Sequence, residues 1–360
     1  MAANPGPAGF SAALQRDWAG PRPGWRARLL QPLSWLYAGL AALHHGLYRS
    51  GLKPARRAPV PVLVVGNLVA GGGGKTPTVL ALLPRLRALG FTPAVVSRGH
   101  GRRGTGLCEV LEHSRASEVG DEPLLIHRRG RVPVVVGADR VAAAQALCAA
   151  HAEVDLIVTD DGLQHHRLAR EAEVWVFDER GAGNGLLLPA GPLRQPLPRR
   201  VPAHARVLYT AGQASTPLPG CIGTRRLGAL LPLADWWRGA QAGDGGVADG
   251  WTVLPARGRP VLAAAGLARP EAFFRMLEAR GLSIRRLPLA DHHSLQPPPW
   301  PADTTELVLT EKDAVKLPPE AVAGGPQVWV ATLDFQPEAA FDAALASLVT
   351  PLRRRPPFPA

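Results

Sequence analysis

Short apolar runs alternate with helix-like segments through the middle of the chain. Runs rich in valine, leucine and isoleucine occupy residues 60–65, 92–97, 132–136, 154–159, 174–178 and 206–210. Helical segments are expected at 76–89, with a kink at Pro84, and at 138–151. Nearly continuous apolar strands joined by helices are typical of a parallel sheet that is buried on both faces. The pattern therefore predicts an α/β core domain.

A second alternation of strands and helices follows a linker at residues 211–220, in which small residues and proline prevail. It includes the segments VLAAAGL, EAFFRMLEARG, TELVLT and QVWVATL. These segments predict a second, smaller α/β domain. The expected organisation is a basic N-terminal segment at 1–58, a core domain at 59–212, the smaller domain at 213–345 and a disordered tail at 346–360.

The N-terminal segment contains one uncharged stretch with helical periodicity. Between residues 29 and 47 there is no Asp, Glu, Lys or Arg, and leucines recur at spacings of four and three, at positions 29, 33, 36, 40, 43 and 47. This spacing puts the six leucines on one face of an amphipathic helix. The helix could pack on its own domain, lie in the plane of an anionic membrane, or cross that membrane.

The net charge and its distribution along the chain indicate which kinds of molecule the protein can bind. The formal net charge is +12, and the first 60 residues hold eight basic residues against one acidic residue. A basic excess at one end suits an anionic membrane surface, whereas nucleic-acid binding is disfavoured because no aromatic-basic interleaving or known module is present. Three widely spaced cysteines fit neither a disulfide framework nor a zinc site, which indicates a reducing compartment.

A cluster of glycines follows the first apolar run. Residues 66–76 read GNLVAGGGGKT, so a strand, a glycine-rich turn and Lys75-Thr76 at a helix start occur in succession. Backbone N–H groups in such a turn can surround a phosphate, with the lysine at the β- and γ-phosphates and the threonine hydroxyl on Mg²⁺. The pattern departs from the common form, which has glycine where Val69 stands. We assign ATP binding to Val69, Ala70, Gly71, Gly72, Gly73, Gly74, Lys75 and Thr76.

The apolar run at 154–159 leads directly into Asp160 and Asp161. Adjacent carboxylates at the end of a buried strand repel each other unless a cation lies nearby, and a P-loop fold places its Mg²⁺-binding acid there. We therefore predict Thr76, Asp160 and Asp161 as metal ligands. His165 and His166, which follow closely, leave a zinc site as an alternative.

Eight motifs taken in order resemble the tetraacyldisaccharide 4′-kinase (lipid A 4′-kinase) family over about residues 30–330. They read VGNLVAGGGGKTP, VVSRGHG, GDEPLLI, TDDGLQHHRLAR, GNGLLLPAGPLRQP, AAGLARPEAFF, DHH and TEKDAVK. The resemblance implies a P-loop domain and a smaller α/β domain, with the active site between them and domain closure during the reaction. It implies ATP and Mg²⁺, and phosphorylation of the 4′-hydroxyl of a tetraacylated glucosamine disaccharide 1-phosphate. It also implies a place at the cytoplasmic face of the inner membrane.

The resemblance implies roles for single residues as well. Asp121 of GDEP corresponds to the catalytic aspartate and His292 of DHH to its partner; from the residues alone, Asp121 would be an exposed loop acid. Arg194, Asn184 and Lys312 are candidate contacts to substrate or phosphate. For Lys312 the alternative is a surface salt bridge to Glu311 or Asp313.

Two positions depart from the family pattern: Gln195 stands where glutamate is usual, and His100 stands where tyrosine is usual.

A second function is compatible with the same loop. A regulatory ATPase with a deviant P-loop would share the glycine cluster and a membrane helix, with nucleotide state controlling membrane binding. It leaves GDEP, DHH and GNGLLLPAGPLR without a role, so the kinase is the favoured hypothesis. No obligate protein partner is evident in the sequence.

Overall fold

The computed structural model describes residues 7–71, 73–241 and 244–354, and its chain divides into two compact units. The first unit comprises residues 1–78, 155–224 and 337–360; the second comprises residues 79–154 and 225–336. The chain passes between the units inside α4 (Lys75–Ala88), β8 (Cys221–Pro232) and β12 (Gln327–Pro337). The domain boundaries expected from the sequence stay a prediction.

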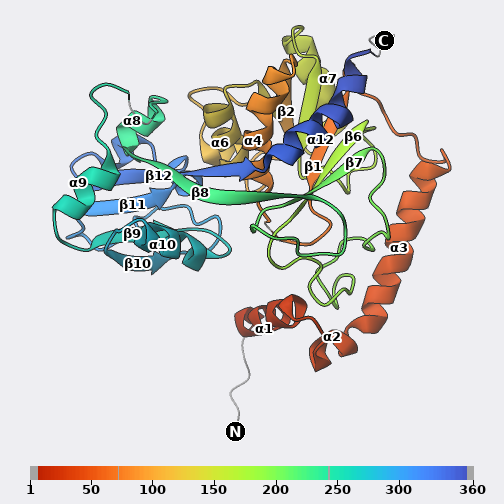
Figure 1. The fold of residues 1–360 in the computed structure, drawn as a ribbon, viewed down its shortest axis with the longest axis horizontal. Coiled ribbons are helices and arrows are strands. Elements are labelled where there is room, and N and C mark those ends of the chain that lie inside the picture. The colour runs from red at the N-terminus through yellow and green to blue at the C-terminus, as the bar shows by residue number, and fades with distance from the viewer. Residues whose placement is uncertain (1–6, 72, 242–243, 355–360) are drawn as a thin grey trace. The chain divides into compact units, whose positions relative to one another are not determined.

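The first unit is built on a parallel sheet in the order β8-β7-β6-β1-β5. Its strands other than β8 are β1 (Val62–Gly66), β5 (Leu156–Asp160), β6 (Ala172–Phe177) and β7 (Ala205–Tyr209). Its helices are α1 (Pro7–Ala19), α2 (Trp25–Leu29), α3 (Gln31–Arg49) and α12 (Ala339–Val349), followed by a 3₁₀ turn at Thr350–Arg354 (Figure 1). β1, β5 and β6 are buried along their whole length, as expected for a sheet covered on both faces.

The second unit contains two groups of strands. In one group β4 (Val134–Val136) lies between β2 (Pro93–Ser97), which is parallel to it, and the antiparallel β3 (Cys108–Glu109). The other group has the order β10-β9-β11-β12-β8, from β9 (Val261–Ala265), β10 (Ile284–Pro288) and β11 (Glu306–Thr310). Its core is formed by Phe273, Phe274 and Leu277 against Val308 and Trp329.

The helices of the second unit are short. They are α5 (Ala116–Val119), α6 (Asp121–Gly130), α7 (Arg140–Ala150), α8 (Leu233–Trp237), α9 (Gly250–Ala256), α10 (Pro270–Ala279), α11 (Glu311–Ala314) and the 3₁₀ turn Pro319–Val322. The predicted α/β class, with mostly parallel strands, is confirmed.

The expectation of a disordered tail from residue 346 is wrong for the part of the tail that the structure describes. α12 continues to Val349 and the 3₁₀ turn to Arg354, because Leu348, Val349 and Leu352 are buried. Burial of these apolar side chains stabilises the ordered conformation of the segment relative to an exposed tail. The rest of the predicted tail, 355–360, lies outside the described residues.

α3 contacts the first unit through its polar side, and its leucines face outward. The Ser34 hydroxyl donates to the carbonyl of Leu187 at 2.8 Å, and the Tyr37 hydroxyl donates to the carbonyl of Arg194 at 2.8 Å. The His45 ring lies 4.9 Å from that of His166. Burial lowers the pKa of His166 to about 4, assisted by the nearby Arg170 and histidines, so the His166 ring is neutral at ordinary pH.

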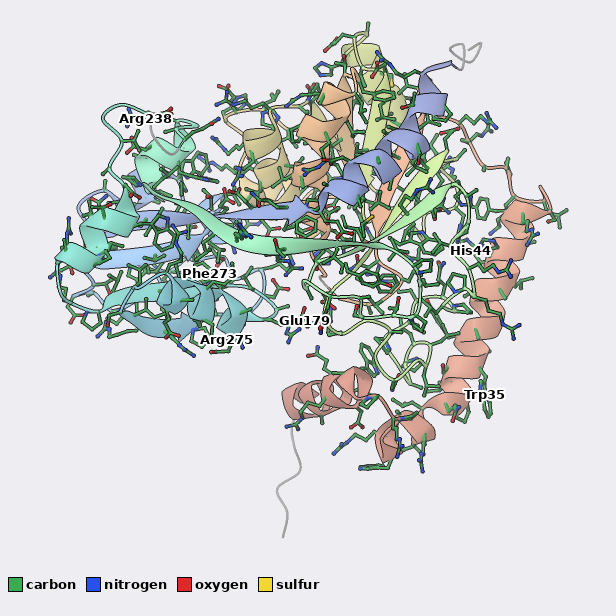
Figure 2. All side chains as sticks on the ribbon, in the orientation of Figure 1. Trp35, His44, Glu179, Arg238, Phe273 and Arg275 are labelled. Carbon is green, nitrogen blue, oxygen red and sulfur yellow. The ribbon has the colours of Figure 1, made fainter. Side chains whose placement is uncertain are left out.

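The exposed side of α3 is therefore the apolar side. Leu29 in α2, just before it, and Leu33, Leu36, Leu40 and Leu43 in α3 are 54–72% exposed, and Trp35 is also exposed (Figure 2). Monomeric soluble proteins rarely expose a contiguous apolar stripe of this length. Within the described residues no helix combines the length and apolar character needed to cross a membrane.

Candidate active site

The glycine cluster forms the turn between β1 and α4, as the sequence predicts. Gly71 and Gly74 both adopt φ of +92°, a left-handed conformation that glycine tolerates and residues with a Cβ avoid. A Cβ on Gly73 would come within 2.5 Å of the Asn67 amide nitrogen. Gly72 lies outside the described residues. The turn thus brings bare backbone close to the first turn of α4, where Lys75 and Thr76 are largely buried.

Side chains from neighbouring strands support this turn. The Thr210 hydroxyl, just after β7, donates to the carbonyl of Gly73 at 3.3 Å. Asp178, just after β6, binds the Arg180 guanidinium at 2.7 Å, and that guanidinium faces Gly71. These groups follow the carboxyl ends of parallel strands, the edge at which α/β folds bind ligands.

The predicted acidic pair lies at the end of β5. Asp160 is 2% exposed, and Asp161 has the left-handed φ of +54°. The Lys75 ammonium is 3.6 Å from one carboxylate oxygen of Asp161, and the Arg194 guanidinium is 3.0 Å from the other. A strained backbone at a residue between two cations is typical of a functional position rather than a surface turn.

The donor set around this pair fits a hard divalent cation. Two carboxylates and the Thr76 hydroxyl are oxygen ligands of the kind that Mg²⁺ prefers, and they leave coordination positions for phosphate oxygens and water. Thr76, Asp160 and Asp161 would be the residues to hold the ion. The zinc alternative lacks a ligand set: among the described residues no three His, Cys, Asp or Glu side chains are grouped to bind a metal.

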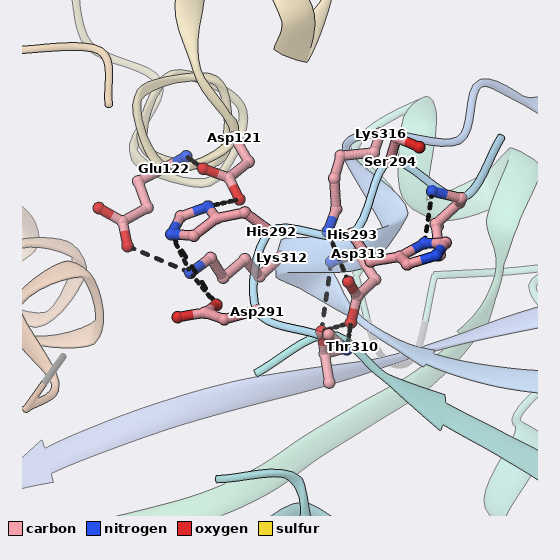
Figure 3. Close-up of polar contacts among 12 residues, drawn as sticks. Asp121, Glu122, Asp291, His292, His293, Ser294, Thr310, Lys312, Asp313 and Lys316 are labelled. Carbon is pink, nitrogen blue, oxygen red and sulfur yellow. Dashed lines mark hydrogen bonds and ion pairs between the residues drawn. The ribbon is translucent and has the colours of Figure 1, made fainter. Parts of the chain in front are cut away.

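A second polar cluster lies in the other unit, around Asp121 (Figure 3). Asp121 is the first residue of α6, after Gly120 with φ of +94°, and it is 6% exposed. The interpretation of Asp121 as an exposed loop acid is therefore wrong. One of its carboxylate oxygens accepts from the backbone N–H of Glu122 at 2.9 Å, and the helix N-terminus further favours the negative charge.

His292 meets the other oxygen of Asp121. The Nδ1 atom of His292 lies 2.8 Å from Asp121 Oδ2, and the two residues are 171 positions apart in the chain. His292 adopts the left-handed φ of +60° on the loop that follows β10. The His100 ring lies 5.3 Å from the His292 ring, so the departure from the family pattern at His100 falls next to this pair.

The hydrogen bond between Asp121 and His292 shifts the pKa values of the two residues in opposite directions. Burial raises the pKa of Asp121, but the hydrogen bond with His292 and the positive charges of Lys312, His292 and Lys316 together hold that pKa below its ordinary value. The hydrogen bond with Asp121 raises the pKa of His292 despite burial and the nearby Lys312 charge. Asp121 is thus ionised at neutral pH and can accept a proton.

Lys312 completes the cluster. Its ammonium lies 3.1 Å from Asp291 Oδ1, 3.4 Å from His292 Nε2 and 3.5 Å from Glu122 Oε1. The predicted alternative, a salt bridge to Glu311 or Asp313, is wrong: Glu311 binds Arg129, and Asp313 binds Lys316.

Comparison with known proteins decides the family. The family model described as LpxK, tetraacyldisaccharide-1-P 4′-kinase, matches residues 26–350. The chain belongs to the tetraacyldisaccharide 4′-kinase family. Its relatives include the tetraacyldisaccharide 4′-kinases of Methylibium petroleiphilum, 51% identical, and Leptothrix cholodnii, 49% identical. Each alignment covers 96% of this chain, with 96% and 97% of the two relatives.

A solved structure agrees with the family assignment. The crystal structure of LpxK from Aquifex aeolicus in complex with ATP matches with a TM-score of 0.72 and 25% identity, over 91% of this chain and 99% of that one. The recognition of the family from the eight motifs is therefore confirmed, and the chain is an enzyme of the kinase class.

Within this tetraacyldisaccharide 4′-kinase family member, Arg194 and Asn184 have different surroundings. Arg194 lies near the glycine turn, since its backbone N–H donates to Leu68 and its guanidinium donates to Asp161 and Gln164. The Asn184 side chain is nearly buried and bonds the backbone of Asp17, Leu186 and Ala190 at 3.0–3.3 Å. Its contact with substrate stays a prediction, without support from these bonds.

Several site residues of this kinase were not identified from the sequence. Asp178 and Thr210 end the runs 174–178 and 206–210, and Arg180 follows the first of these runs. A strand-end rule would have found all three, because ligands bind beyond the carboxyl ends of parallel strands. Gln164, whose amide oxygen accepts from Arg194 at 3.0 Å, sits within the recognised motif TDDGLQHH. Glu122 and Asp291 lie within the motifs GDEPLLI and DHH, but only the fold shows that they contact Lys312.

Proposed function

We propose that the protein transfers the γ-phosphoryl group of ATP to the 4′-hydroxyl of a tetraacylated glucosamine disaccharide 1-phosphate, a step in lipid A biosynthesis. Family membership and a structural relative in complex with ATP support kinase chemistry and ATP as donor. The observation that carries the proposal is the hydrogen bond between the buried carboxylate of Asp121 and the His292 ring. A P-loop protein that only switches between nucleotide states has no need of a buried base for an acceptor hydroxyl.

In this mechanism residues 69–76 bind the triphosphate. The backbone N–H groups of the glycine turn and the Lys75 ammonium neutralise the phosphate oxygens, and charge at those oxygens grows in the transition state. Mg²⁺, when bound by Thr76, Asp160 and Asp161, would screen the β- and γ-phosphates. Arg194 donates from Nη1 to Asp161 and Gln164, and a planar guanidinium beside this site suits phosphate oxygens.

Asp121 supplies the other half of the reaction. A sugar hydroxyl is a weak nucleophile, and a carboxylate that accepts its proton as the phosphoryl group moves contributes roughly 10²–10⁴-fold. Asp121 Oδ2 is held by His292 and Oδ1 by the Glu122 N–H, so the carboxylate has one fixed orientation. Phosphoryl transfer requires that the γ-phosphate reach the hydroxyl that Asp121 activates.

The decisive experiment compares ATP consumption with and without lipid acceptor. Labelled ATP, Mg²⁺ and the disaccharide 1-phosphate in detergent micelles should yield a doubly phosphorylated lipid, with negligible ATP hydrolysis when the lipid is omitted. ATP hydrolysis of equal rate without the lipid, and no labelled lipid, would overturn the proposal in favour of the regulatory ATPase.

We further propose that α3 holds the enzyme at the cytoplasmic face of the inner membrane, lying in the membrane plane. The polar side of α3 is occupied by contacts to its own unit, so its exposed leucines are available to lipid acyl chains. Arg28, Arg49 and Lys53 flank the stripe and suit anionic headgroups, at about 1 kcal/mol each. The acyl chains of the proposed substrate reside in the same layer.

Replacing three stripe leucines tests this placement. The variant Leu36→Ser/Leu40→Ser/Leu43→Ser should bind vesicles of phosphatidylglycerol and phosphatidylethanolamine at least about tenfold more weakly in sedimentation, because burial of each leucine is worth about 1.5–3 kcal/mol. The matched control is Leu107→Ser/Leu111→Ser, which changes two exposed leucines of the other unit. Equal binding by the triple variant and wild type would contradict a membrane role for α3.

A further inference from the structure

The Lys312 ammonium lies within a complete set of acceptors. It is in hydrogen-bond contact with Asp291 Oδ1 at 3.1 Å and His292 Nε2 at 3.4 Å, and it forms an ion pair with Glu122 Oε1 at 3.5 Å (Figure 3). Burial lowers the pKa of Lys312, but the charges of Glu122, Asp121 and Asp291 outweigh burial and raise it. Lys312 is therefore charged at neutral pH and has no lone pair, so it can only donate.

This constraint decides what the His292 ring can do. When Nε2 accepts from Lys312, the neutral ring must carry its proton on Nδ1. Nδ1 is the atom that lies 2.8 Å from Asp121 Oδ2, so the ring donates to the ionised Asp121. In the other neutral tautomer the Nε2–H donor would face the ammonium, which is also a donor. The unprotonated Nδ1 would face the carboxylate, which is also an acceptor.

The backbone that carries Lys312 is fixed from below. The Thr310 hydroxyl caps α11 by accepting from the Asp313 N–H, and it donates to the Asp313 carboxylate at 2.7 Å. That carboxylate, which is fully buried, also accepts from the Gly266 N–H and from Lys316. These bonds hold α11 to the loop after β9. The backbone at Lys312 is therefore held in place by contacts other than those of the Lys312 side chain.

We propose that Lys312 is a positioning residue that selects the Nδ1–H tautomer of His292 and so keeps the catalytic carboxylate of Asp121 ionised and oriented. The inference rests on the proposed kinase function and assigns to Lys312 a role that involves no contact with substrate. It replaces the expectation that Lys312 contacts a phosphate, since the ammonium is already surrounded by protein acceptors.

Other titratable groups near His292 define what a test must control. Asp121 and Glu122 belong to α6, Asp291 and His293 adjoin His292 in its own loop, Lys316 follows α11, and the His100 ring lies 5.3 Å away. None of these groups is a cation within hydrogen-bond distance of Nε2, whereas the Lys312 ammonium is. Its removal leaves the ring facing carboxylates, so the His292 pKa should rise and the ring should become doubly protonated at higher pH.

Two measurements test the proposal, and the first requires no substrate. In protein labelled with ¹⁵N-histidine, long-range ¹H–¹⁵N correlation spectra report which ring nitrogen is protonated; His292→Gln identifies the His292 signals by their absence. Wild type should show the Nδ1–H tautomer above the ring's pKa, and Lys312→Arg should retain it. Lys312→Met should show the ring's titration moved to higher pH.

The second measurement is the rate. Lys312→Met should lower kcat by about 10–100-fold, leave the KM for ATP within about twofold, and move the acidic limb of the kcat profile to higher pH. An Nε2–H tautomer in wild type, or a loss of kcat in Lys312→Met with an unchanged His292 spectrum, would overturn the proposal. If the kinase hypothesis itself is wrong, wild type will show no lipid-dependent turnover, whereas the His292 spectra will still be as predicted.

Discussion

Lys75→Ala should reduce lipid-dependent phosphoryl transfer by about 10²–10³-fold or more. Lys75 is the cation that the glycine turn places at the start of α4, and it is largely buried, with its ammonium 3.6 Å from Asp161. Removal of one preorganised group aimed at developing charge costs rates of this order. The measurement is the initial rate of labelled lipid formation at saturating ATP, together with calorimetric titration of ATP in the presence of Mg²⁺.

Lys75→Arg should restore little of the lost rate. The chain has 37 arginines and only four lysines, yet a lysine stands at this position. A compact ammonium can enter the space bounded by the glycine backbone, whereas a planar guanidinium is broader and has its donors in a fixed fork. Arg275→Ala is the control, because Arg275 is an exposed cation that lies outside the site; it should leave micellar activity unchanged. Wild-type rates in Lys75→Ala would contradict the assignment of residues 69–76 to ATP.

The parts of this fold that the sequence predicts well are those whose environment is uniform along the chain. β1, β2, β5 and β6 coincide with apolar runs to within about two residues, because a strand buried on both faces needs apolar side chains at every position. The same reasoning placed Asp160 and Asp161 at the end of β5. Here local pattern and tertiary environment carry the same information.

The prediction failed where burial depends on partners that are distant in sequence. Asp121 reads as a loop acid, but α6 starts at it and His292, 171 residues later, covers it. Lys312 reads as a neighbour of Glu311 and Asp313, yet its partners are Glu122 and Asp291. At the C-terminus, arginine and proline outweighed the helical spacing of Phe341, Leu345 and Leu348, which the structure buries.

Asp121→Asn should lower kcat by about 10²–10⁴-fold and leave the affinity for ATP nearly unchanged. The amide has the shape of the carboxylate but only one acceptor oxygen, so it can replace the carboxylate towards either the Nδ1–H of His292 or the N–H of Glu122, and it cannot take the proton of the acceptor hydroxyl. Because Asp121 lies outside residues 69–76, its charge is not needed to bind the nucleotide. The measurements are kcat with lipid in micelles and calorimetric titration of ATP.

The pH dependence of kcat tests the direction in which the pKa of Asp121 is shifted. The pKa of Asp121 is held below its ordinary value, so the carboxylate stays ionised down to acidic pH and the rate should fall only as pH passes below that range. His292→Gln removes the hydrogen bond and the positive charge that lower this pKa, while burial continues to raise it. The fall should therefore begin at higher pH in His292→Gln than in wild type.

Asp303→Asn is the control for both experiments, since Asp303 is exposed and belongs to the same unit as Asp121. It should retain wild-type kcat, ATP affinity and pH profile. If Asp121→Asn lost ATP affinity and thermal stability to the same extent as kcat, Asp121 would be a structural residue at the start of α6. If kcat alone fell and the profile of His292→Gln matched that of wild type, Asp121 would act as the base without electrostatic help from His292.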